Sequence, residues 1–176
     1  MNKKKLELYL HIPFCVRKCA YCDFLSFAAP ERMYREYVDK LIEEIYGQSE
    51  NFREYQVVSI FVGGGTPSLL PASLMEELFA VLHQCFDIEA DAEITIEANP
   101  GTLTMEKLEL YRQSGVNRLS LGLQSADDQE LNYLGRIHTY EDFLKSYQRA
   151  RQAGFTNINV DLMSCLLYTS DAADEL

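Results

Sequence analysis

The chain has 176 residues, enough for one sizeable hydrophobic core, and its composition is ordinary for a globular protein, with 47% apolar and 24% charged residues. Its 27 acidic residues outnumber 16 basic ones, and the resulting net charge of −11 argues against binding to nucleic acid. No apolar run could span a bilayer and no secretory signal pattern follows the first methionine, so we expect a cytoplasmic protein.

Strand and helix patterns alternate along the chain. Residues 6–12, 56–62, 92–98, 117–123 and 156–163 have the β-branched and alternating character of strands. Helical spacing of apolar residues covers 31–46, 73–86, 104–114, 127–134 and 139–153. Ser73 and Glu76 form an S-x-x-E pattern that predicts a capping box at the start of the second helix.

This alternation predicts an α/β fold. Strands separated by helices pair in parallel through right-handed crossovers. Periodicity alone leaves two architectures open, an open sheet or part of a (β/α) barrel. In both, ligands gather beyond the carboxyl ends of the strands, so the residues at those ends are the candidates for function.

Three cysteines follow the first predicted strand with the spacing C-x3-C-x2-C: Cys15, Cys19 and Cys22. Three thiolates on one short loop can bind three irons of a cubane [4Fe–4S] cluster and leave the fourth iron open to another ligand. The alternative is a structural zinc site completed by His11, although zinc sites usually take pairs of ligands from two chain segments. A disulfide would leave one cysteine unpaired.

Other polar or glycine residues end the remaining strands. Residues 63–65 are three glycines, which either allow a ligand to approach the backbone or form a tight turn. Glu97, Gln124 and Asp161 stand at or near later strand ends, where a single polar residue often only caps a loop. Their convergence on one rim favours a binding site.

These motifs resemble the radical S-adenosylmethionine (SAM) superfamily, whose hallmark is C-x3-C-x-Φ-C with an aromatic Φ, here Tyr21. The segments Gly-Gly-Gly-Thr-Pro (63–67), Ile-Glu-Ala-Asn-Pro (96–100) and Asn-Arg-Leu-Ser-Leu-Gly-Leu-Gln (117–124) are similar to its oxygen-independent coproporphyrinogen oxidase branch. The similarity covers residues 6–163. It implies a parallel partial (β/α) barrel with the cluster loop after the first strand, here truncated after about the fifth strand.

The resemblance also implies the site. Cys15, Cys19 and Cys22 would be the cluster ligands, and no catalytic residue is assigned. The positions that match SAM contacts of the branch are Tyr9, Tyr21, Gly64, Gly65, Thr66, Glu97, Gln124, Arg136 and Asp161. A guanidinium at position 136 suits the carboxylate of the methionine moiety, although an Arg after a short helix is by itself usually a solvated charge.

Within the branch, the oxidases continue with a fourth cysteine two residues after the third, where this chain has Phe24. That departure resembles the haem chaperones of the branch. The implied partners are haem or a porphyrin, a flavodoxin- or ferredoxin-type electron donor and a haem-acceptor protein, through which a peripheral membrane contact would arise. The alternative is oxidative decarboxylation of coproporphyrinogen III, in which an electron from the cluster cleaves SAM to methionine and a 5′-deoxyadenosyl radical.

The resemblance stops after Ser164. We therefore predict an incomplete radical SAM core over residues 1–164 and a non-native tail over 165–176, with a divergent genuine tail as the alternative. Cys85 lies on the apolar side of its helix and is predicted to be a buried core thiol. His11 and His138 are not spaced as a metal-binding pair, and their roles stay open.

Overall fold

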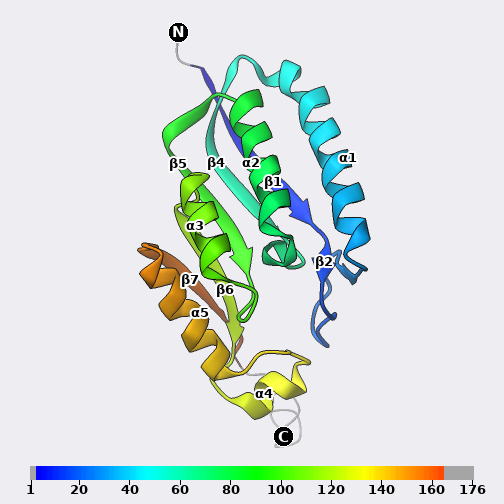
Figure 1. The fold of residues 1–176 in the computed structure, drawn as a ribbon, viewed down its shortest axis with the longest axis vertical. Helices are drawn as coiled ribbons and strands as arrows, with labels where there is room; N and C mark the ends of the chain where they lie inside the picture. Colours follow the sequence, from blue (N-terminus) through cyan, green and yellow to red (C-terminus); the bar gives the residue numbers. More distant parts are fainter. Residues whose placement is uncertain (1–2, 165–176) are drawn as a thin grey trace, which may run out of the picture.

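A computed structural model of the protein describes residues 3–164. Its centre is a five-stranded parallel sheet in the order β1-β4-β5-β6-β7, shown in Figure 1. The strands are β1 (Lys4–Ile12), β4 (Tyr55–Gly64), β5 (Ile88–Ala98), β6 (Arg118–Gln124) and β7 (Asn157–Leu162). All five predicted strands are confirmed.

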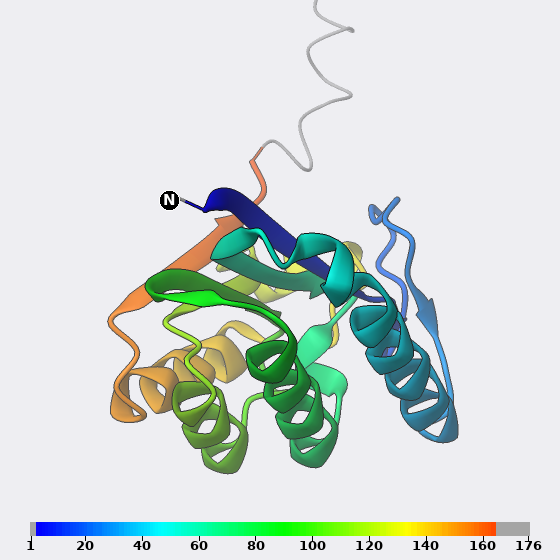
Figure 2. The same ribbon diagram turned by 90° about the horizontal axis from the view of Figure 1, so that it is seen from above.

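Four long helices connect these strands and lie on one face of the sheet (Figures 1 and 2). They are α1 (Arg32–Ser49), α2 (Ala72–Cys85), α3 (Met105–Gln113) and α5 (Tyr140–Gln152), and the short α4 (Asp128–Tyr133) precedes the last of them. Two single turns of 3-10 helix, η1 (Glu50–Phe52) and η2 (Pro67–Leu69), flank β4.

The strand order decides between the two architectures. Each main strand pairs with the next one along the chain, and right-handed crossovers then place every helix on the same face. A doubly wound sheet would reverse direction at a switch point and carry helices on both faces. The parallel partial barrel is therefore confirmed.

The core lies between the sheet and these helices. Alternate strand residues point into it and are fully buried, including Ile12, Val62, Ile96, Leu119 and Leu121. The opposite, concave face is polar, as described below. The sheet thus has one apolar face that the helices cover and one polar face that is open to a ligand.

Two details of the helices differ from expectation. The capping box at Ser73 is wrong: α2 begins at Ala72, and its N-cap Pro71 makes no side-chain hydrogen bond. Pro71 fixes an extended entry, which leaves Ser73 inside the first turn. A capping box does exist at Thr139, where the side chains and backbone of Thr139 and Asp142 bond reciprocally.

Cys85, predicted to be a buried core thiol, is only partly buried in the structure. It is the last residue of α2 and is partly exposed, although it packs against the core. His83 and Gln84 in the same final turn are exposed, so this turn is only partly covered by the core. Within the described residues, no helix is both long and apolar enough to cross a membrane.

Candidate functional site

The cysteine loop leaves the end of β1 and is closed at its base by two very short strands that the sequence did not suggest. β2 (Phe14–Cys15) and β3 (Phe27–Ala28) pair in parallel, and the Phe27 amide donates to the Pro13 carbonyl at 2.9 Å. Within the loop, the Cys22 amide donates to the Cys19 carbonyl at 3.2 Å. The three thiols, all free and partly exposed, are thereby held on one short, pinned segment.

Each thiol has one polar neighbour, and two of these neighbours come from elsewhere in the fold. The Thr66 hydroxyl donates to Cys15 Sγ at 3.7 Å, and Arg136 Nη1 donates to Cys19 Sγ at 3.6 Å. The Ser26 hydroxyl lies 3.9 Å from Cys22 Sγ. Hydrogen bonds of this kind stabilise thiolates, which are the form that binds iron.

The three thiols suit a cluster better than a single ion. Among residues 3–164, no group of three or more His, Cys, Asp or Glu side chains is placed to share one metal ion. A cubane cluster does not require this, because each cysteine binds a different iron. His11, the fourth ligand in the zinc alternative, has other partners: Nε2 lies 2.9 Å from the Leu25 carbonyl and Nδ1 lies 3.3 Å from the Tyr9 hydroxyl.

The glycines after β4 allow this strand end to pack against the cysteine loop. A Cβ on Gly65 would lie 2.6 Å from the Phe14 carbonyl oxygen, which is backbone and cannot move aside. Gly64 has a φ of +118°, and a Cβ there would meet the His11 ring at 2.7 Å. Both positions therefore require glycine for close approach, and their backbones form part of the wall beside the thiols.

Glu97, at the end of β5, accepts a hydrogen bond from the Gly64 amide at 3.0 Å. Burial raises the pKa of Glu97; the Gly64 amide opposes this, and the nearby Asp161 carboxylate raises the pKa further. The carboxylate ties the glycine segment to β5 and keeps a second oxygen beside the cavity.

Arg136 lies between the cysteine loop and the strand ends. Its Nη2 donates to Asn99 Oδ1 and to the Gly122 carbonyl, both at 2.7 Å. Its Nη1 contacts Cys19 Sγ and the Tyr21 hydroxyl, the latter at 3.4 Å. Nε is buried and has no hydrogen-bond partner among the described residues, so the guanidinium has one unused donor.

A cavity of about 740 Å³ lies among these groups. Every residue predicted for the site except Tyr9 lines it: Cys15, Cys19, Tyr21, Cys22, Gly64, Gly65, Thr66, Glu97, Gln124, Arg136 and Asp161. Tyr9 lies three residues before the end of β1, where the residue is 60% exposed and its ring stacks on Phe61. The expectation that the rim residues converge is therefore met by the geometry, with Tyr9 set apart.

Sequence reasoning missed several lining residues, of which Asn99 and Gly122 have the clearest roles. A Cβ on Gly122 would lie 3.0 Å from Gln124 Nε2 and 3.1 Å from Asn99 Oδ1. Gln124 itself has a φ of +73°, unusual for a residue with a side chain, and marks backbone strain at the cavity. Asn99 could have been suspected, because it directly follows a strand end.

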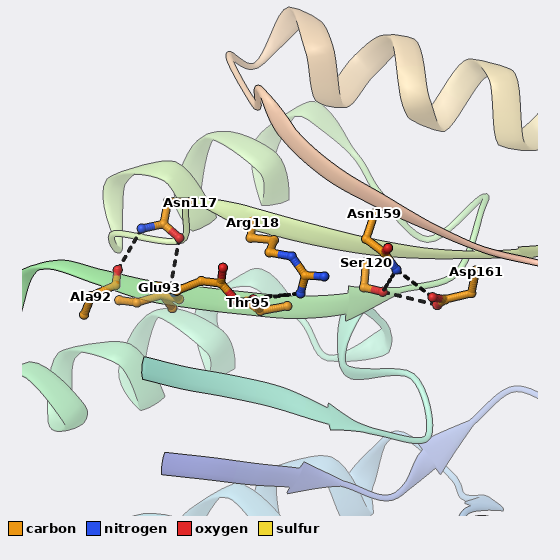
Figure 3. A network of polar contacts seen from close by, with 9 residues as sticks. Ala92, Glu93, Thr95, Asn117, Arg118, Ser120, Asn159 and Asp161 are labelled. Carbon is orange, nitrogen blue, oxygen red and sulfur yellow. Dashed lines mark hydrogen bonds and ion pairs between the residues drawn. The ribbon is translucent and has the colours of Figure 1, made fainter. Parts of the chain in front are cut away.

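The concave face of the sheet carries the polar network of Figure 3, in which Ser120 and Asp161 also line the cavity. The Ser120 hydroxyl donates to Asp161 Oδ2 at 3.2 Å, and Asn159 Nδ2 donates to both of these residues, at 3.0 Å and 2.6 Å. Further along β6, Arg118 Nη1 donates to the Thr95 hydroxyl at 3.3 Å. Bulky aliphatic residues fill a closed barrel, so this polar lining indicates an open lumen.

A family model described as the radical SAM superfamily matches residues 9–176, and the chain therefore belongs to this superfamily. Membership implies a [4Fe–4S] cluster and SAM as cofactors. The free thiols with their donors and the unused donor of Arg136 fit such a group.

Among similar proteins, the chain is 42% identical over 159 residues to the haem chaperone HemW of Escherichia coli (strain K12), an alignment that covers 90% of this chain and 42% of HemW. It is 36% identical over 167 residues to the oxygen-independent coproporphyrinogen-III oxidase-like protein HemZ of Bacillus subtilis (strain 168), covering 92% and 33%. The solved structure of coproporphyrinogen III oxidase HemN from Escherichia coli matches with a TM-score of 0.85 and 32% identity, over 91% of this chain and 37% of HemN. The chain thus spans about two-fifths or less of these relatives. Residues 165–176, predicted to be a non-native tail, lie outside the described residues.

Proposed function

We propose that this chain is the cluster- and SAM-binding part of a haem chaperone of the HemW kind. The observation that carries the proposal is the placement of three free thiols, each beside one polar group, on the wall of a cavity that the strand ends enclose. The 42% identity to HemW supports the haem-handling role. Haem, a reductant and a haem-acceptor protein are the proposed partners.

In this proposal Cys15, Cys19 and Cys22 hold the cluster, whose electron makes reductive cleavage of SAM possible when both are bound. The chain's own residues would orient the cofactor. Gly64, Gly65 and Thr66 offer backbone and hydroxyl groups, and Glu97, Gln124 and Asp161 offer polar side chains from three neighbouring strands. Tyr9 is proposed as an additional contact from β1, below the cavity.

A second candidate is the oxidative decarboxylation of coproporphyrinogen III. The observation that favours it is the likeness to HemN at a TM-score of 0.85. Phe24, which is 70% exposed beside the cavity, favours the chaperone, because it replaces the fourth cysteine that the oxidases carry. Haem binding is therefore the favoured function of this chain, ahead of porphyrinogen turnover.

The test of the metal centre is anaerobic reconstitution with iron and sulfide. The protein should turn brown, and Cys22→Ala should lose most of its bound iron, because each thiolate binds a different iron. Cys85→Ala is the matched control: this thiol lies on α2, outside the cavity, and its loss should leave iron content unchanged. Equal iron content in Cys22→Ala and the unsubstituted chain would contradict the assignment.

The test of function follows on the reconstituted chain. Haem should remain bound through gel filtration, and coproporphyrinogen III incubated with SAM and a reductant should be recovered unchanged. Conversion of coproporphyrinogen III without haem retention would replace the chaperone proposal by the oxidase one. A colourless, zinc-containing protein that assembles no cluster would contradict both.

A further inference from the structure

Asn99 occupies a fixed position between the end of β5 and the cysteine loop, and every polar group that it carries has a partner. Its backbone N–H donates to the Ser68 hydroxyl at 3.3 Å, and its backbone carbonyl accepts from the Thr102 hydroxyl at 2.7 Å. Its side chain contacts Thr66 on one side and Arg136 on the other. A residue anchored in this way through its main chain can hold its side chain in one orientation.

The chemistry of its neighbours fixes which end of the side-chain amide faces which partner. A guanidinium can only donate, so the atom 2.7 Å from Arg136 Nη2 must be the oxygen, Oδ1. Nδ2 then faces Thr66 and donates to its hydroxyl at 2.9 Å. Because the Thr66 oxygen is already an acceptor, its own proton is free to point at Cys15 Sγ, 3.7 Å away.

The same carbonyl oxygen acts on the second thiol. Arg136 uses Nη2 for Asn99 and for the Gly122 carbonyl, which leaves Nη1 directed at Cys19 Sγ at 3.6 Å. Gly122 is required for this arrangement, since a Cβ there would lie 3.1 Å from Asn99 Oδ1 and 3.3 Å from Arg136 Nη2. One amide side chain therefore orients two donors toward two different thiols.

We propose that Asn99 is a positioning residue that sets the reduction potential of the cluster by directing the Thr66 hydroxyl to Cys15 and the Arg136 guanidinium to Cys19. The inference rests on the proposed assignment of these cysteines as cluster ligands. Hydrogen bonds to cluster sulfurs stabilise the more negative, reduced state and raise the potential. If the Thr66 hydroxyl and the Arg136 guanidinium no longer point at these two sulfurs, the cluster should be harder to reduce.

The experiment is a redox titration of the reconstituted chain, monitored by electron paramagnetic resonance of the reduced cluster. Asn99→Ala should lower the equilibrium constant for reduction about tenfold, which is about 59 mV for a one-electron couple. Asn99→Asp keeps the shape but accepts from both neighbours. It should lower the potential further, because the Thr66 proton turns to the new carboxylate and a negative charge is added.

A pair of variants isolates the contribution of the Thr66 hydroxyl, which donates to Cys15. Thr66→Val should lower the potential, whereas Thr66→Ser keeps a hydroxyl and should retain the original value. In the Thr66→Val background, Asn99→Ala should shift the reduction potential less than it does alone, because only the orientation of Arg136 toward Cys19 remains to be lost. Fully additive shifts would show that Asn99 does not act through Thr66 and would overturn the inference.

Asn117 provides a matched control at the opposite end of the sheet. Its side chain bridges two backbone groups: it accepts from the Ile94 amide at 2.9 Å and donates to the Ala92 carbonyl at 2.8 Å, the latter bond being visible in Figure 3. Asn117→Ala should destabilise the fold and leave the potential unchanged. If Asn99→Ala forms a cluster of unchanged potential, the inference is wrong; if the unsubstituted chain forms no cluster, the proposed cofactor site itself is wrong.

Discussion

Tyr111 is a buried tyrosine whose replacement should make the protein more stable. Its side chain lies on α3 in the core with 0% of its surface exposed, and its hydroxyl has no hydrogen-bond partner among residues 3–164. Burial also raises the pKa of the phenol well above its usual range, so the hydroxyl remains neutral but unsatisfied. Tyr111→Phe removes only this oxygen and keeps the packed ring.

The expected gain follows from the cost of burying a hydroxyl without a partner, about 1–3 kcal/mol in protein mutational data. For a domain of this size, each 1 kcal/mol corresponds to a change of about 2–4 °C in Tm. We therefore expect the free energy of unfolding of Tyr111→Phe to rise by about 1–3 kcal/mol. Urea unfolding followed by circular dichroism measures this, and the slope m should stay the same.

Tyr37 supplies a control with the opposite sign. Its hydroxyl donates to the His11 carbonyl at 2.5 Å, so Tyr37→Phe deletes the same atom but breaks a hydrogen bond. That change should cost about 0.5–1.5 kcal/mol. If Tyr111→Phe were destabilised as much as Tyr37→Phe, the Tyr111 hydroxyl would have a partner and the reasoning from its burial would be refuted.

Three further predictions concern the cavity and its surroundings. Burial and the nearby Arg136 guanidinium lower the pKa of His138 to about 4. The Leu123 carbonyl, 3.2 Å from Nε2, and the carboxylates of Asp142 and Asp128 oppose this shift. As the pH falls, His138 is therefore protonated in the unfolded chain before it is protonated in the folded one. On the order of 3 kcal/mol of stability should be lost between about pH 6.5 and pH 4. Urea unfolding at each pH measures this loss, and His138→Gln should abolish it. Gly65→Ala should displace Phe14 and lower the iron content after reconstitution, whereas Gly101→Ala, whose added Cβ meets nothing within 4 Å, should leave iron content unchanged despite its strained φ of +85°. Gln124→Gly should be more stable than Gln124→Ala by about 1 kcal/mol, because only glycine relieves the φ of +73°; equal stability would argue against strain at this position.

The sequence predicted the strands and the main helices because each carries its own periodicity, and sequential pairing of the strands then made the partial barrel. The predicted capping box at Ser73 was wrong because Pro71 controls the helix entry. β2 and β3 are too short to leave a pattern in the sequence.

The site was predictable to the extent that parallel strands bring their carboxyl ends to one rim. Glu97, Gln124 and Asp161 end three strands, and all three line the cavity with the thiols. Asn99 was not predictable in its role, because its partners Thr66 and Arg136 come from loops far apart in sequence and meet only in three dimensions.

The three cysteines are close to one another in the sequence, whereas two of the groups that donate to them are far from them in the sequence. The three cysteines lie within one stretch of eight residues, so even an unfolded chain brings them within reach of one another. Thr66, in contrast, is 51 positions from Cys15, and Arg136 is 117 positions from Cys19. A ligand that binds both the folded and the unfolded chain adds little to folding stability. Iron content would then report mainly on the cysteine loop and the residues packed against it, and only weakly on the rest of the barrel. The redox properties of the bound cluster would be a sensitive one, because they depend on donors that only the folded sheet delivers.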